Sequence, residues 1–187
     1  MPAENLKSVS ITNLDASPIV ENTAGQAAAG YLQCSNDHVA STTGVTSPST
    51  YRLVRVPSNA IIKQVLLTNA ALSTSTAADI DIAFSDSTTD GTQQALAGGI
   101  VQISGPVDNK LFGSAVSLVA AQKNQDQTFA NTYTTAMQNL ELWNALVSLG
   151  ATQFTSDPGG FFDFVVKTTT TVTAGGDISL EVRFVIP

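Results

Sequence analysis

The hydrophobic pattern is densest between Tyr51 and Leu72, where two apolar runs are separated by residues 57–60. Both runs are rich in valine, isoleucine and leucine, and the proline between them cannot donate a hydrogen bond to a sheet, so the pattern predicts a β-hairpin. Neither run alternates cleanly, which predicts strands that are apolar on both faces. Such strands need cover on both faces. We therefore expect the core on one side of this hairpin and another layer or another chain on the other.

The same hairpin supplies the candidate residues for a subunit interface. Its three cations are among only eight lysines and arginines in a chain of formal net charge −7. Cations on apolar strands of an acidic protein need carboxylate partners, and we expect these pairs to form across the subunit contact. The seven candidates are Tyr51, Arg52, Leu53, Arg55, Ile61, Lys63 and Val65.

Three further segments alternate as half-buried strands do. Residues 79–85, 161–167 and 177–186 place apolar side chains on one face and polar side chains on the other, where we expect solvent. Turn-forming residues at 157–160 and 174–177 bound the last two segments, which predicts a second hairpin. Many short strands with turns between them and little helix predict a mainly β fold, namely an antiparallel β-sandwich that is jelly-roll-like.

The strongest helix signal lies between Leu140 and Leu149, where leucines recur at helical spacing. Asn139 suits the N-cap of this helix, and Gly150 suits the position just after its end. A helix this short is stable only when its apolar face docks onto other elements. We expect it at one end of the stacked sheets.

Residues 93–129 carry weaker signals. Leu111, Ala115 and Leu118 recur at helical spacing, which predicts a second helix capped by Asp108 or Asn109. A short strand is expected at residues 100–103, and residues 122–127 have the polar composition of an exposed loop.

Residues 1–50 are poor in large apolar side chains, so we expect an extended N-terminal arm followed by a β-sandwich domain at residues 51–187. The arm has the composition of a segment that is ordered only against a neighbouring subunit. The N-terminus lacks a basic stretch followed by an apolar core, so no signal peptide is expected. No run of about 18 apolar residues predicts a membrane span.

The charge balance limits the partners. Only 12% of the residues are charged, and the sequence pI is about 4.4. Binding to nucleic acid through phosphates requires clustered lysine and arginine, and so does binding to an anionic membrane. We expect neither partner.

The residues that carry chemistry are sparse. His38 is the only histidine and Cys34 the only cysteine, and their spacing of four places them about 13 Å apart on a strand. The chain has no nucleophile elbow and no nucleotide-binding glycine loop, and two residues are too few for a zinc site. Asp79, Asp81 and two following aspartates lack the order of a calcium loop, so we interpret them as solvated surface. We expect no enzyme, no cofactor and no metal.

A succession of short motifs resembles a family of small structural proteins of tailed phages and prophages, over roughly residues 50–187. The motifs begin at Tyr51 (Tyr-Arg-Leu-Val-Arg-Val-Pro-Ser-Asn-Ala-Ile-Ile-Lys), Ala77 (Ala-Ala-Asp-Ile-Asp-Ile), Leu111 (Leu-Phe-Gly-Ser-Ala-Val-Ser-Leu), Leu142 (Leu-Trp-Asn-Ala-Leu) and Asp157 (Asp-Pro-Gly-Gly-Phe-Phe-Asp). The resemblance implies a virion component made in the host cytoplasm. Most specifically, it implies a capsid decoration (cement) protein that sits as a homotrimer on the capsid surface and binds the major capsid protein.

Three alternatives stay open at this point. The resemblance also suits a head fibre or a tail protein. A carbohydrate-binding β-sandwich would need a row of exposed aromatic side chains, and a β-sandwich hydrolase would need His38 or two convergent carboxylates.

Overall fold

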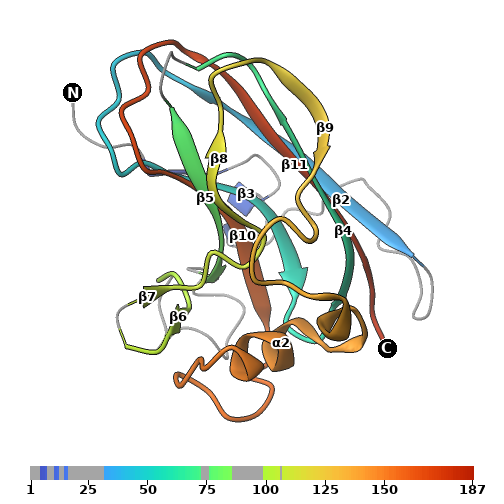
Figure 1. Ribbon diagram of the computed structural model, residues 1–187. Coiled ribbons are helices and arrows are strands. Elements are labelled where there is room, and N and C mark those ends of the chain that lie inside the picture. The colour runs from blue at the N-terminus through green and yellow to red at the C-terminus, as the bar shows by residue number, and fades with distance from the viewer. Residues whose placement is uncertain are drawn as a thin grey trace.

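The computed structural model describes residues 5–7, 11–12, 15–16, 32–72, 76–85, 99–105 and 107–187. These residues form two packed β-sheets, a small two-stranded sheet and a short helix at one end (Figure 1). The elements are β1 (Asn5–Lys7), β2 (Gln33–Ser41), β3 (Thr50–Pro57), β4 (Ile61–Asn69), β5 (Ala77–Phe84), β6 (Gln102–Ile103), β7 (Val107–Asp108), β8 (Gly113–Ser117), β9 (Gln122–Asp126), the 3₁₀ helix η2 (Thr135–Asn139), α2 (Leu142–Ser148), β10 (Phe161–Thr168) and β11 (Gly176–Val185).

The predicted mainly β, antiparallel sandwich is confirmed. Sheet A has the strand order β1-β3-β10-β5-β8, and sheet B has the order β2-β11-β4-β9. All of these neighbours are antiparallel except β1 and β3, which run parallel. The jelly-roll subtype stays a prediction.

Both predicted hairpins are wrong, although all four of their strands exist. β3 lies in sheet A and β4 in sheet B. Likewise, β10 lies in sheet A and β11 in sheet B. The turn after β3 therefore carries the chain from one sheet to the other. Turn residues such as Pro57 and Ser58 encode a reversal of the chain, but they do not encode whether the two strands pair.

Two β-bulges explain why β3 and β4 do not alternate. The register of β3 against β10 shifts at Leu53, and the register of β4 against β11 shifts at Lys63. A bulge adds one residue to one strand, so apolar residues before and after it can face the same side. Tyr51 and Val54 accordingly belong to the same hydrophobic core. The irregular pattern of β3 thus reflects a bulge, and the prediction that this strand is apolar on both faces is wrong. β4, in contrast, carries Leu66 on the face away from the core.

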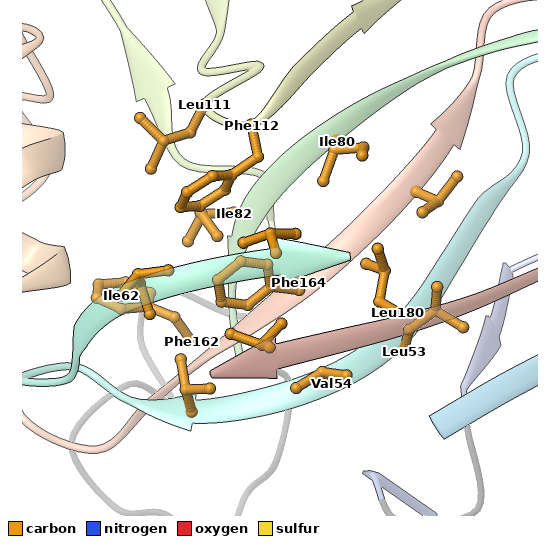
Figure 2. Packing of buried hydrophobic residues seen from close by; sticks show 14 of the residues in the cluster. Leu53, Val54, Ile62, Ile80, Ile82, Leu111, Phe112, Phe162, Phe164 and Leu180 are labelled. Atoms are coloured by element: carbon orange, nitrogen blue, oxygen red, sulfur yellow. The ribbon is translucent and has the colours of Figure 1, made fainter. Parts of the chain in front are cut away.

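The core lies between the two sheets (Figure 2). Phe162 and Phe164 of β10 pack there with Ile82 of β5 and Ile62 of β4, and all four side chains are inaccessible to solvent. Phe112 stacks on Phe164 with ring centroids 5.2 Å apart, which adds about 0.5–1.5 kcal/mol to the burial of their area. A sandwich with a continuous core of this kind holds its strands rigidly.

The helix α2 closes one end of the sandwich (Figure 1), as predicted. The backbone N–H of Leu142 donates to the carbonyl of Ala60 at 2.8 Å, which fixes the start of the helix to the turn after β3. Gly150 follows the helix with φ = 100°, a left-handed conformation that glycine adopts at little cost. The predicted start was early, because Asn139 ends η2 and Glu141 occupies the N-cap position.

The predictions for residues 108–127 are wrong. Residues 113–117 form the edge strand β8 instead of a helix, and residues 122–126 form the edge strand β9 instead of a loop. Asn109 is not a helix cap. Its side chain accepts the N–H of Ile82 and donates to the carbonyls of Ile82 and Val101, so it takes the place of a strand residue beside β5. Helical spacing over three residues was too little to establish a helix.

The predicted arm at residues 1–50 needs correction where the structure describes it. β2 pairs with β11 from Gln33 to Ser41, so this part of the arm is a strand of the sandwich. β1 pairs with β3 at the edge of sheet A. The sequence allowed a strand to begin at residues 31–34, but large apolar side chains are rare in β2, so nothing indicated that this strand belongs to the sandwich. Residues 17–31 lie outside the described residues.

Candidate functional site

The structure buries most of the predicted interface residues within the chain itself. Tyr51, Leu53 and Val65 have no exposed surface and face the core. Arg52 and Arg55 are also buried, but on the opposite, outer face of sheet A. These five residues therefore offer no surface to another subunit. Only Ile61 and Lys63 stay half-exposed.

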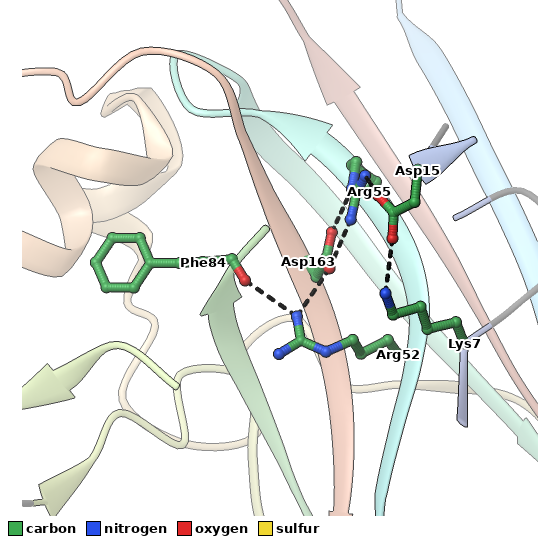
Figure 3. A network of polar contacts seen from close by, with 6 residues as sticks. All are labelled: Lys7, Asp15, Arg52, Arg55, Phe84 and Asp163. Atoms are coloured by element: carbon green, nitrogen blue, oxygen red, sulfur yellow. Dashed lines mark hydrogen bonds and ion pairs between the residues drawn. The ribbon is translucent and has the colours of Figure 1, made fainter. Parts of the chain in front are cut away.

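Arg52 and Arg55 surround one carboxylate, Asp163 of β10 (Figure 3). Arg52 Nη1 donates to Asp163 Oδ2 at 2.9 Å and also to the carbonyl of Phe84 at 3.0 Å. Arg55 donates twice, from Nε to Oδ1 at 2.6 Å and from Nη2 to Oδ2 at 3.1 Å. The side chain of Asp163 is 0% exposed, and that of Arg55 is 2% exposed. The expected pairing of these cations with carboxylates thus occurs, but inside the chain.

The third cation, Lys63, has a different partner. Its ammonium donates to the carbonyl of Gln138 at 2.7 Å, which attaches β4 to the end of η2. This lysine therefore links the sandwich to the helical end.

The N-terminal segment closes the charged network on the β3 side. Asp15 accepts a hydrogen bond from Arg55 at 2.5 Å and one from Lys7 at 2.8 Å (Figure 3). Burial opposes the charge of Asp15, but the bonds from Lys7 and Arg55 outweigh it and lower the pKa of Asp15. Burial likewise opposes the charge of Arg55, and Asp163 together with Asp15 outweighs it, so the pKa of Arg55 is raised. The segment is thus held on the sheet by paired charges.

The predicted solvated face of residues 79–85 is also buried. Asp81 is inaccessible to solvent, and Asp79 nearly so. Asp81 Oδ1 accepts the backbone N–H of Lys110 at 2.7 Å, and Asp79 Oδ1 accepts that of Ala115 at 2.8 Å. The alternation correctly placed these aspartates on the face opposite the core, but it did not indicate that residues 107–115 cover this face.

The two backbone donors are themselves unusual. Lys110 and Ala115 have φ values of 43° and 52°, the left-handed region that residues with a side chain seldom adopt. Each such residue costs of order 1 kcal/mol, which buried hydrogen bonds must offset. The aspartates of β5 supply those bonds, so they fix the path of the covering segment.

Asp163 was missed as a central residue because its alternation with phenylalanines predicted a solvated position. One signal could have found it. β10 carries apolar residues on both faces, such as Phe164 and Val165, and a lone carboxylate in such a strand needs a buried cationic partner. Arg52 and Arg55, on another strand without clean alternation, are the matching cations.

The outer face of sheet B is open to solvent. β2 exposes Asn36 and His38 on this face, and the His38 side chain is 64% exposed. Across the strands, Arg183 donates to Gln64 at 3.0 Å, and Gln64 donates to Asp126 at 3.1 Å. This face, defined by the outward residues of β2, β11, β4 and β9, is mostly polar and mixed in charge, with Leu66 among its polar residues. We refer to it as the open face.

Cys34 and His38 both lie on β2, where strand geometry separates them by about 13 Å. Burial and the neighbouring Glu181 raise the pKa of the Cys34 thiol, which disfavours the nucleophilic thiolate.

Among the described residues, no group of three or more histidine, cysteine, aspartate or glutamate side chains is arranged to hold a metal ion. The other two aspartates of the calcium hypothesis, Asp86 and Asp90, fall outside the described residues. Within the described ranges, no helix has the length and hydropathy to cross a membrane.

Comparison with known proteins shows the fold. No protein-family model matches the sequence, and no curated protein is significantly similar to it. A chain in the structure "Capsid of Ralstonia phage GP4" aligns with 98% of this chain and 98% of its own length, with a TM-score of 0.58 and 13% identity. A chain of the "Cyanophage Pam1 capsid asymmetric unit" aligns over 92% and 96% of the two chains, with a TM-score of 0.46 and 13% identity. The first likeness shows that this β-sandwich also occurs in a phage capsid structure.

Proposed function

We propose that this protein is a non-enzymatic structural component of a phage virion, and in particular a head decoration (cement) protein. One observation carries the proposal, namely the likeness of fold to a chain of the Ralstonia phage GP4 capsid structure over 98% of both chains. A likeness of this extent includes both sheets and the elements between them. The rigid core and the internally paired charges support the same function, because a decoration protein needs a stable scaffold and a surface but no reactive group.

The proposed partner is the major capsid protein in the assembled lattice, bound by a homotrimer of this chain. Three copies that each make a weak contact bind a lattice far more tightly than one copy does, because the second and third contacts form within one complex. We place the contact on the open face of sheet B and on the adjoining half-exposed residues Ile61 and Lys63 of β4. The outer face of sheet A is occupied by the chain itself, so the open face is the sheet surface available for contact.

Co-sedimentation of the purified full-length protein with capsids tests the proposal. The capsids come from the phage that encodes the chain, after deletion of its gene. We expect saturable binding to assembled capsids and little binding to unassembled capsid protein, together with a trimer in analytical ultracentrifugation at micromolar concentration. A monomer that does not bind assembled capsids would contradict the decoration function. Incorporation of the protein into tails or fibres would assign it to another part of the virion.

A further inference from the structure

The described residues donate a hydrogen bond to only one of the two carboxyl oxygens of Asp81. Oδ1 accepts the backbone N–H of Lys110 at 2.7 Å. Oδ2 is buried and has no hydrogen-bond partner among the described residues. A buried, unsatisfied polar atom costs about 1–3 kcal/mol, and more when it carries charge. The position therefore favours a neutral carboxylic acid over a carboxylate.

The charges around Asp81 favour the neutral form as well. Asp79 lies on the same strand, Asp108 faces it from β7, Lys167 from β10, and Lys110 from the turn between β7 and β8. Both lysines are already paired, Lys110 with Asp79 and Lys167 with Asp108. The cluster thus holds three carboxyl groups and two ammonium groups, and Asp81 is the one acid without an ion-pair partner among these residues.

Burial is the largest cause that raises the pKa of Asp81, to about 7, and repulsion from Asp108 and Asp79 adds to it. The N–H of Lys110 and the charge of Lys167 oppose the rise but do not cancel it. This direction agrees with the geometry, because the group with an unsatisfied buried oxygen is also the one without a counter-ion.

We propose that Asp81 is a proton-binding site that holds residues 107–115 against sheet A more firmly when its carboxyl group is neutral than when it is ionised. The neutral acid carries its proton on Oδ2, and Oδ1 keeps the bond from Lys110. Loss of the proton places a third negative charge beside Asp79 and Asp108 at a position that is inaccessible to solvent. Water reaches Oδ2 only if the covering segment moves away from β5, so ionisation favours opening of that segment.

The segment is suited to such opening. Lys110 and Ala115 have left-handed backbone conformations, whose cost the bonds to Asp81 and Asp79 help to offset. β8 is an edge strand whose register against β5 is irregular, so few ladder bonds resist its displacement. Leu111 and Phe112 anchor the segment in the core, so ionisation of Asp81 raises the population of the open form without releasing the segment outright.

The sign of the pH dependence follows from proton binding. The folded state binds the proton of Asp81 up to about pH 7, whereas the unfolded chain releases it near the ordinary value of about 4. The stability that the proton contributes is complete below about pH 4 and is lost as the pH rises to about 7. The segment should therefore be better protected in mild acid than in mild base.

Hydrogen exchange of the full-length protein at about pH 5 and about pH 9, corrected for intrinsic exchange rates, tests the proposal. The variant Asp81→Asn keeps the acceptor for Lys110 and cannot ionise, and Asp177→Asn removes an exposed carboxylate as the matched control. In the wild type and the control, we expect protection of residues 109–115 to fall by about tenfold or more at the higher pH. In Asp81→Asn, we expect equal protection at both pH values.

Two results would overturn the proposal. One is protection in the wild type that does not change with pH, and the other is a pH dependence that survives in Asp81→Asn. If that variant fails to fold, a carbon-13 NMR titration of the wild-type aspartates decides, because titration of Asp81 near its ordinary pKa contradicts a proton site. Millimolar calcium at the higher pH is expected to change nothing. Calcium that restores protection through Asp81 would identify a cation site instead.

Discussion

The two outer faces of the sandwich contain similar residues in opposite settings. The outer face of sheet A carries Arg55, Asp163 and Asp81, all buried under other parts of the chain. The open face of sheet B carries Arg183 and His38, whose side chains are 42% and 64% exposed. The difference shows that a charged residue on a strand need not be exposed to solvent. In this protein, the closed face carries charged residues just as the open face does.

The two settings differ in energy as well as in exposure. A buried ion pair contributes little beyond its desolvation cost, but removing one partner leaves an uncompensated charge, at a cost of about 3–5 kcal/mol. An exposed pair contributes about 0–1 kcal/mol and is screened by salt. Single substitutions therefore have very different effects on the two faces, although the side chains look alike in the sequence.

Asp163→Ala is the substitution that we expect to have the largest effect. It leaves the guanidinium groups of Arg52 and Arg55 buried without their shared carboxylate, so we expect a loss of about 3–5 kcal/mol in the free energy of unfolding. Urea denaturation at neutral pH measures this loss. Asp177→Ala, on an exposed residue of β11, is the control and should stay within about 0.5 kcal/mol of the wild type.

Equal, small effects of both substitutions would break the comparison. That result would mean that water or another cation-binding group replaces Asp163, and that the face is not closed in solution. A large effect of both would mean that the open face is covered as well.

Asp15→Asn should have an intermediate effect, because it loosens the N-terminal segment without exposing the core. Two charged hydrogen bonds weaken, which costs about 1–3 kcal/mol at neutral pH. Asp15 has a lowered pKa in the folded state, so its contribution is present above its ordinary pKa and is lost as the pH falls through the lower, folded value. Urea denaturation from neutral to acidic pH should therefore show wild type and variant converging in acid. Curves that stay parallel at all pH values would contradict an ionised Asp15 at this contact.

The strands of the fold could be predicted from the sequence, whereas their partners could not. Residues 161–167 and 177–186 alternate, and the structure has strands there. Nothing in the turn between them indicates that the chain crosses to the other sheet, because pairing depends on distant strands. The bulges at Leu53 and Lys63 are equally invisible, since an extra residue only looks like broken alternation. Broken alternation was interpreted as a second apolar face, and the interface was therefore placed on residues that the fold itself buries.

The closed face shows the same limit for individual charges. Alternation assigned Asp81 and Asp163 to the face opposite the core, and this assignment is correct. Whether that face is exposed to solvent depends on residues that are distant in the sequence. Lys110 bonds to Asp81 directly, and Lys7 bonds to Asp15, which in turn contacts the face. Local patterns therefore predict the side of a sheet, but long-range contacts decide its exposure.

Arg183→Ala should have the smallest effect on stability and the most informative effect on binding. Arg183 contacts Glu181 and Gln64 on the open face, and exposed contacts of this kind contribute little to stability. Urea denaturation should therefore give a free energy of unfolding close to that of the wild type. Arg55→Ala is the matched variant on the closed face and should lose about 3–5 kcal/mol.

The same pair of variants separates the proposed contact from the scaffold that supports it. If the open face contacts the capsid, Arg183→Ala should bind capsids about two- to tenfold more weakly in co-sedimentation, with unchanged stability, because the variant removes a charge at the contact. Unchanged binding of Arg183→Ala, in a protein that still binds capsids, would move the contact away from this part of the open face. The end formed by α2 and the β6–β7 turn would then be the next surface to test, because these elements lie outside the two sheets at one end of the sandwich (Figure 1).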